Sequence, residues 1–248
     1  MQAAYILWLR QLKRYFRSRS RIFGSLAQPL LFLFAFGFGF GPIFQKAGGG
    51  NYIDFLTPGI ISQGVLFTAI FSGIELIWDR QFGFLKETLV APVTRFEIMI
   101  GRTLGGATIA TVQGIFILAL SLIAGFRPHS LTDILSAVGI MFLISLLFTG
   151  VGTAIASKLS DFQGFQLVMN FLVLPLFFLS GALFPLKGLP EALNIIARIN
   201  PLTYGVDALR NVLTHSSYYN LGLDITVLSV LTVVVIGIGS YLFSKIEI

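Results

Sequence analysis

The sequence predicts an all-α integral membrane protein built as a single domain over residues 1–248. The chain is 55% hydrophobic and only 11% charged, whereas an average soluble domain has roughly 25% charged residues. Its mean hydropathy is +0.86, so a body of this size cannot bury all of its apolar side chains away from water. The apolar residues also fall in long runs, and about 20 such residues cross a bilayer core of about 30 Å.

The remaining composition narrows the classes of site and partner. Cysteine is absent, which excludes disulfides, thiolate metal sites and a cysteine nucleophile. The net charge of +6 would suit nucleic acid, but the basic residues stand at the edges of the apolar runs, where they set membrane topology. We therefore expect contact with membrane lipids and none with nucleic acid.

Residues 1–21 predict a helix that lies in the membrane surface. Apolar side chains recur at helical spacing on one face: Tyr5, Trp8, Leu9, Leu12, Tyr15 and Phe16. The opposite face carries the cations Arg10, Lys13, Arg14, Arg17 and Arg21. Aromatic rings at the acyl boundary and cations near anionic headgroups are typical of an interfacial helix. A plain basic topology signal is the alternative, and both interpretations place the segment at the cytoplasmic surface.

Apolar windows then predict six transmembrane helices. They cover residues 22–44, 56–77, 98–126, 131–156, 162–184 and 223–243. Residues suited to the start of a helix precede or open three of them: Thr57 with Pro58, Ser130 with Asp133, and Ser160 with Asp161. The first window is longer than the 7–15 apolar residues of a secretory signal peptide, so we do not expect it to be cleaved.

The basic residues also predict the orientation. Of the 17 lysines and arginines, twelve fall on the side of the two termini. The other side carries only Lys46, Arg127, Lys187, Arg198 and Arg210. Because lysine and arginine gather in cytoplasmic loops, we expect both termini in the cytoplasm and the protein in a plasma or inner membrane.

Two connections contain more than a simple turn. Residues 79–97 combine acids and bases with Phe82 and Phe84, and Pro92 ends any helix there. This segment is typical of a docking segment for a partner in the aqueous phase, although a connector lying on lipid is the alternative. Residues 185–222 predict two short helices, 192–199 and 204–213, that form an external re-entrant hairpin shielded by protein.

The chain lacks the usual catalytic and nucleotide-binding patterns. His129 and His215 fall in predicted external loops without a carboxylate at ligand spacing, so we expect surface residues and no metal site. No lysine follows a glycine, and the phosphate-binding loop of ATPases is therefore missing. We expect neither catalytic residues nor a cofactor bound by this chain.

Two groups of residues inside the apolar windows are candidates for a role in structure or transport. Glu75 lies near the cytoplasmic boundary, where a structural ion pair is favoured over a proton relay. The aromatic and polar residues that would line a substrate path are Phe67, Phe71, Gln166, Asn170 and Phe177. Ordinary packing between helices is the alternative for these five.

Several motifs are shared with a known family. They are Thr57-Pro58-Gly59, Asp79 to Gly83 followed by Pro92, Gly101-Arg102, Phe184-Pro185, Pro190, Asn200-Pro201-Leu202-Thr203-Tyr204 and Asp207-Ala208-Leu209-Arg210. Over essentially its whole length the chain resembles the permease subunit of type-2 ABC exporters, the group that includes daunorubicin-resistance and nodulation-factor permeases. Many members of that group have glutamate where this chain has Gln81.

The resemblance implies a mechanism. Two permease chains, here identical, would pair with two cytoplasmic ATPase subunits that bind ATP and Mg²⁺. Residues 79–97 would hold the coupling helix, with contacts from Asp79, Arg80, Phe82, Gly83, Phe84, Leu85 and Glu87. Residues 1–21 would form the connecting helix beside it, and the second and fifth spans would line the path.

The substrate implied by the resemblance is an amphipathic drug, lipid or glycolipid-like molecule, as in multidrug efflux, exported from the cytoplasm or inner leaflet. A carrier or channel driven by an ion gradient is the first alternative. An integral-membrane enzyme or assembly scaffold is the second, although it would need paired catalytic carboxylates or histidines near one membrane face.

Overall fold

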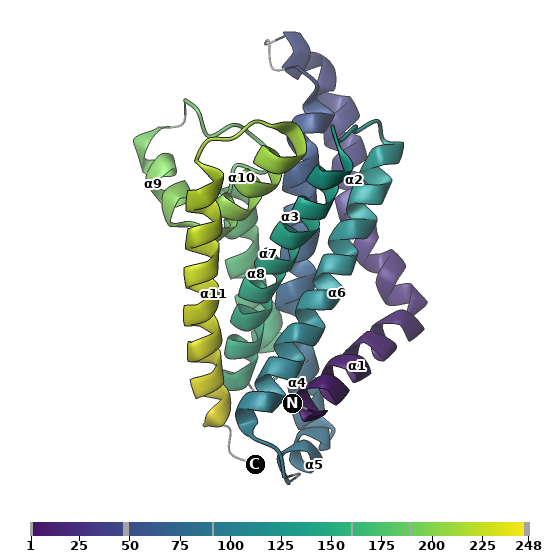
Figure 1. Ribbon diagram of the computed structural model, residues 1–248, viewed down its shortest axis with the longest axis vertical. Helices are drawn as coiled ribbons and strands as arrows, with labels where there is room; N and C mark the ends of the chain where they lie inside the picture. The colour runs from purple at the N-terminus through teal and green to yellow at the C-terminus, as the bar shows by residue number, and fades with distance from the viewer. Residues whose placement is uncertain (1, 47–49, 91, 160, 189, 246–248) are drawn as a thin grey trace.

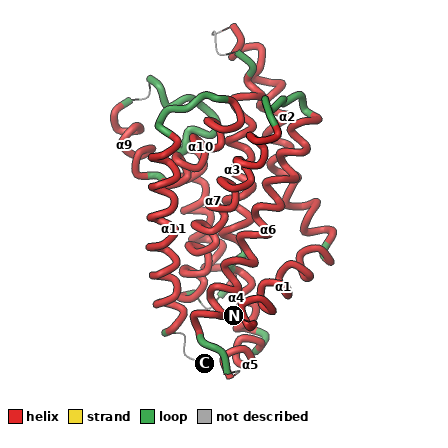
Figure 2. Tube along the Cα trace, viewed as in Figure 1, coloured by secondary structure: helices red, strands yellow, loops and turns green. Residues whose placement is uncertain are grey.

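The computed structural model describes residues 2–46, 50–90, 92–159, 161–188 and 190–245, and these residues form helices and loops without a strand (Figure 2). The helices are α1 Gln2–Arg17, α2 Arg19–Lys46, α3 Tyr52–Phe71, α4 Ile74–Gln81, α5 Phe84–Val90, α6 Arg95–Ile123, α7 Leu131–Lys158, α8 Phe162–Phe178, α9 Glu191–Ile199, α10 Pro201–Thr214 and α11 Leu221–Ser244.

The long helices run side by side in an elongated bundle (Figure 1). Helices α1 and α5 and the last turn of α11 lie at one end of the bundle, and α9 and α10 lie at the other. We call these the α5 end and the α10 end. Helix α1 slopes away from the bundle axis, and the chain then turns at Ser18 into α2.

Five helical stretches in the described residues are long and apolar enough to cross a membrane: Arg19–Lys46, Tyr52–Gln81, Arg95–Ile123, Leu131–Lys158 and Leu221–Ser244. The second of these joins α3 and α4. The predicted window 162–184 corresponds to the shorter apolar helix Phe162–Phe178. That helix ends six residues earlier than expected, because the chain turns after Leu179 and Gly181 adopts a left-handed φ of 75°.

The helix starts agree with the sequence in two cases and differ in one. Ser130 caps α7 in a capping box with Asp133, and Asp161 caps α8 through Gly164 N–H. Ser160 lies outside the described residues. The predicted cap at Thr57 is wrong, because α3 begins at Tyr52 under Asn51 and the Thr57 hydroxyl donates to a carbonyl inside the helix.

Helix α3 forms the centre of the core, and α6 and α7 pack against it. Its residues 56–66 are all buried. A Cβ on Gly59 would lie 2.3 Å from the carbonyl oxygen of Ala182, and one on Gly152 would lie 2.3 Å from that of Ile70. These glycines therefore allow backbone-to-backbone packing, as expected for small residues between membrane helices.

The α10 end is held by bonds between side chains and main chain. Arg210 is buried and donates to the carbonyls of Phe55 (3.3 Å) and Gly181 (3.0 Å). Burial lowers the pKa of Arg210 to about 10, so the guanidinium is still charged at neutral pH. Asp207 accepts from the N–H groups of Tyr218 and Tyr219. The two predicted short helices are confirmed as α9 and α10, and the re-entrant depth stays a prediction.

Candidate functional site

Helix α5 and the turn before it project from the α5 end and present aromatic side chains to solvent. Gly83, with a left-handed φ of 81°, makes the turn that joins it to α4. Leu85 is buried and anchors the helix, whereas Phe82 and Phe84 are 72% and 51% exposed. Glu87 is exposed. Together with α1 and α4, the two phenylalanines line a cavity of about 400 Å³. The predicted docking segment, residues 79–97, thus contains a short helix with an exposed apolar surface.

Asp79 was expected to contact a partner, but it lies inside the protein and away from the exposed surface of α5. It is buried at 4% exposure on α4 and accepts from Arg10 of α1 at 3.0 Å and 3.2 Å. Arg102 of α6 donates to Oδ2 of the same carboxylate as a second ion pair. Arg102 is itself buried, and Arg10 is more exposed. One carboxylate therefore connects three helices.

The neighbours of Asp79 on α4 are also tied to other helices. Arg80 donates to the carbonyls of Leu159 and Ser157, which are the unpaired acceptors at the end of α7. The buried Glu75 forms an ion pair of 2.7 Å with Arg21 of α2. Asp79, Arg80 and Glu75 therefore hold α4 in place and leave α5 as the free surface.

Helix α1 packs on α6 across its whole length. A Cβ on Gly101 would lie 2.7 Å from the Ala4 carbonyl oxygen, so the two backbones touch there. Trp8 Nε1 donates to Thr108 Oγ1 at 3.0 Å. Further along, Tyr15 donates to Gln113 Oε1 at 2.8 Å, and burial raises the pKa of its phenol, which keeps the donor proton in place.

The predicted face of α1 therefore needs correction. Tyr15 was expected at the acyl boundary, but it is buried against α6 together with Ala4 and Gln11. Tyr5 and Phe16 remain exposed. The predicted cations Arg10, Lys13, Arg14 and Arg17 are all exposed. Two of them also contact α4, since Arg10 binds Asp79 and the guanidinium of Arg14 lies 5.7 Å from the Trp78 ring. Helical periodicity alone could not distinguish a lipid face from a protein face.

The predicted path residues do not all come together. Phe67 and Phe71 line a cavity of about 200 Å³ between α1, α2 and α3, beside Gln63 and Arg21. Phe177 lies elsewhere, fully buried and stacked on Phe32.

The polar residues of α8 do not join this cavity. Gln166 is half-buried and Asn170 is exposed. A path through both helices would therefore need movement or a second chain.

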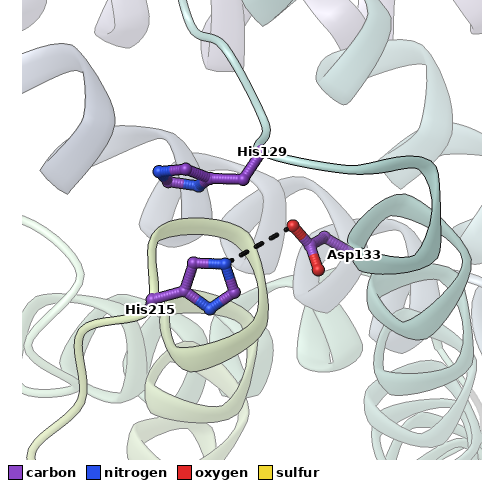
Figure 3. Close-up of side chains that lie close together, drawn as sticks. All are labelled: His129, Asp133 and His215. Atoms are coloured by element: carbon purple, nitrogen blue, oxygen red, sulfur yellow. Dashed lines mark ion pairs between the residues drawn. The ribbon is translucent and has the colours of Figure 1, made fainter.

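Three side chains meet at the α10 end that no pattern in the sequence indicates. His129, Asp133 and His215 lie with their donor atoms within 4.8 Å of one another, so the expectation that no carboxylate accompanies the histidines is wrong (Figure 3). His215 and Asp133 are 82 positions apart in the chain, and no local spacing signals their approach.

Comparisons with known proteins show the family of this chain. The sequence model of the family described as ABC-2 type transporter matches residues 2–214. The ycf38 protein of Cyanophora paradoxa, whose name describes it as a transport permease, is 31% identical over 225 residues, which cover 88% of this chain and 76% of the relative. Its namesake in Pyropia yezoensis is 33% identical, over 85% and 73%. Nodulation protein J of Rhizobium meliloti is 27% identical, over 86% and 81%.

Proposed function

Because this chain belongs to the ABC-2 type transporter family, we propose that it is the permease of an ATP-driven exporter, paired with a second copy of itself and with two cytoplasmic ATPase subunits. Permeases of this family are multi-pass membrane proteins that work with a cytoplasmic ABC ATPase. ATP and Mg²⁺ would bind in that partner. The α5 end, which carries most of the cations, would face the cytoplasm.

The exposed pair Phe82, which ends α4, and Phe84, which begins α5, carries the proposal. Their two rings flank the turn at Gly83 and, with Lys86 and Glu87 of α5, form a small apolar surface with a charged rim. A soluble ATPase can bury such a surface in a groove. Nucleotide makes the ATPase prefer one conformation, and that preference supplies the difference in free energy that a conformational change needs.

The ion pairs of α4 give the movement a route. A force on α5 passes through the turn at Gly83 into α4. From there Asp79 connects to α1 and α6, and Glu75 connects to α2. The cavity lined by Phe67 and Phe71 lies against α2 and α3, within reach of that route.

This cavity favours an amphipathic substrate such as a drug, a lipid or a glycolipid-like molecule. Phe67 and Phe71 offer aromatic surface, whereas Gln63, Gln28 and Arg21 offer hydrogen bonds and a positive charge. Pockets that combine apolar walls with a few polar groups suit ligands of mixed character. We infer export because the family resemblance implies that direction.

The coupling proposal is tested by purifying the permease together with the ATPase partner expressed beside it. Phe82→Ala combined with Phe84→Ala should abolish capture of the ATPase and ATP-dependent transport, while the variant still elutes as a folded protein. Phe23→Ala is the matched control, because Phe23 is also 72% exposed but lies on α2. If capture and transport both survive the double substitution, α5 is not the docking helix.

The pairing of two permease chains is tested by single-cysteine cross-linking. Because the chain has no native cysteine, any disulfide must form at the introduced residue. Phe171→Cys on the exposed face of α8 should give a disulfide-linked dimer in membranes. Val233→Cys, on an exposed face of α11, should not. Equal cross-linking at both positions, or none at Phe171, would argue against a dimer formed through α8.

Transport by the permease alone separates this function from that of an ion-driven carrier. Vesicles holding only the permease should show no accumulation under a proton or sodium gradient. Uphill transport in such vesicles would contradict the dependence on an ATPase.

A further inference from the structure

The α10 end carries a cluster of three side chains that the proposed transport mechanism does not use. His129 comes from the loop between α6 and α7, Asp133 from the first turn of α7, and His215 from the residue that ends α10. One donor atom of each lies within 4.8 Å of the other two (Figure 3). Three separate segments of the chain therefore converge at one point.

The chemistry of this cluster is that of a transition-metal site. Two imidazole nitrogens and one carboxylate oxygen form a donor set that zinc binds well, whereas Mg²⁺ and Ca²⁺ prefer sites made of oxygen atoms. Ligands around a tetrahedral ion with bonds of about 2.0–2.1 Å lie about 3.3 Å apart. The donor atoms of the cluster lie up to 4.8 Å apart, and rotation of the exposed imidazoles of His129 and His215 can bring them to the separation that such an ion requires.

Two of the three groups, His215 and Asp133, form an ion pair when the imidazole is protonated, as the dashed line in Figure 3 marks. Nε2 of His215 lies 3.6 Å from Oδ2 of Asp133, which is beyond hydrogen-bond distance. The same oxygen already accepts from Ser130 N–H at 3.0 Å, so its position is fixed by the capping box of α7. The rings of His129 and His215 approach to 4.8 Å between centroids. A cation placed between the two imidazoles and the carboxylate could bind all three groups.

The backbone at His215 explains how the end of α10 reaches the cluster. Its φ of 51° is left-handed, the conformation that commonly terminates a helix. Among the described residues other than glycine, it is the only one with a positive φ. The turn that ends α10 therefore lies at the cluster, and His215 offers its imidazole there.

We propose that His129, Asp133 and His215 form a binding site for a zinc-type divalent cation at the α10 end. The ion would connect the loop after α6, the start of α7 and the end of α10. Three protein ligands leave at least one coordination position for water or another ligand. The site lies at the opposite end from α5, and the proposal does not depend on the transport function.

The test measures zinc binding by the purified full chain, carrying a tag without histidine. ZnCl2 should raise the midpoint of thermal unfolding in a saturable way, whereas MgCl2 and CaCl2 should not. Co²⁺, used as a spectroscopic substitute, should give a visible absorption band at one ion per chain. Absence of a saturable zinc response, or an equal response to Mg²⁺, would overturn the proposal.

Two variants assign the response to the cluster. His215→Gly removes one ligand and gives the left-handed position its preferred residue, so this variant should fold well. His129→Ala removes another ligand from an exposed loop. Each variant should weaken zinc binding about tenfold or more. A loss of about tenfold is already typical when a residue that only hydrogen-bonds to a metal ligand is changed, and here a ligand itself is removed.

A control variant should retain zinc binding. Glu191→Gln removes an exposed carboxylate elsewhere at the α10 end and leaves all three ligands and the capping box intact. If zinc binding persists undiminished in His129→Ala and His215→Gly, the site lies elsewhere and the proposal is wrong.

Discussion

The buried acids Asp79 and Glu75 at the α5 end bind side chains, whereas the buried acid Asp207 at the α10 end binds the main chain. At the α5 end, ion pairs join helices: Arg10 and Arg102 bind Asp79, and Arg21 binds Glu75. At the α10 end, Asp207 accepts from main-chain N–H groups, and Arg210 donates to main-chain carbonyls of α3 and of the turn after α8. The first arrangement connects helices through their side chains, and the second attaches main-chain groups to buried charges.

This difference agrees with the roles that the proposed function would give to the two ends. Side-chain ion pairs can change partners when helices rotate, so they suit an end that moves. Backbone groups in turns at the α10 end would be costly to leave unpaired near hydrocarbon, so they are fixed by buried charges. We therefore expect the α5 end to transmit movement and the α10 end to stay rigid.

Removal of Asp79 should have the largest effect on stability. Asp79→Ala leaves the buried Arg102 without its carboxylate and should lower the free energy of unfolding by about 3–5 kcal/mol. The measurement is an unfolding titration of the purified chain. Arg10→Ala is the matched control, with a much smaller loss because the Arg10 side chain is 42% exposed. Equal losses in the two variants would contradict a buried network centred on Asp79.

Removal of Arg210 should rank second. Arg210→Met leaves the carbonyls of Phe55 and Gly181 without their charged donor, which should cost about 2–3 kcal/mol. Combined with Asp79→Ala, the two losses should add within about 0.5 kcal/mol, because the two residues lie at opposite ends and share no partner. Strong coupling between them in a double-mutant cycle would show that the ends are not independent.

A single methyl group between α1 and α6 should have an intermediate effect. Gly101→Ala places its Cβ against the backbone of Ala4 and should cost about 1–2 kcal/mol, as overpacking usually does. Gly105→Ala is the comparison, because its nearest neighbour is the Gln11 side chain, which can rotate away. A larger loss for Gly105→Ala than for Gly101→Ala would mean that α1 is not packed backbone to backbone on α6.

The exposed aromatic pair should have the smallest effect on stability. Phe82→Ala should change the free energy of unfolding by no more than about 0.5 kcal/mol, because the side chain is exposed. The same variant, combined with Phe84→Ala, is expected to lose coupling to the ATPase. A marked loss of stability instead would place these rings in the fold rather than at a partner surface.

Much of the architecture could be predicted from the sequence. Long apolar runs locate the long helices, and Ser130 with Asp133 marks the start of α7 correctly. The first of the two short helices before α11 begins directly after Pro190, close to its predicted start, whereas the second begins at Pro201 under Asn200, three residues before the predicted start at Tyr204. These features depend on residues that are neighbours in the chain, and local physical chemistry is enough to read them.

The site was less predictable because its bonds join distant parts of the chain. Asp79 looks like a surface acid among charged neighbours, yet its partners Arg10 and Arg102 are 69 and 23 positions away. Tyr15 fits the pattern of a lipid-facing aromatic, yet it donates to Gln113. A periodic pattern shows which residues share a face, but what covers that face depends on tertiary packing.

The spacing of Glu75 and Asp79 has a mechanical consequence. Four residues apart on a helix, they point to the same side of α4. Since α2 is attached to one of them and α1 and α6 to the other, this short helix is a common anchor for three neighbours. A small twist of α4 would reach all three simultaneously, so the protein would need no sequential relay.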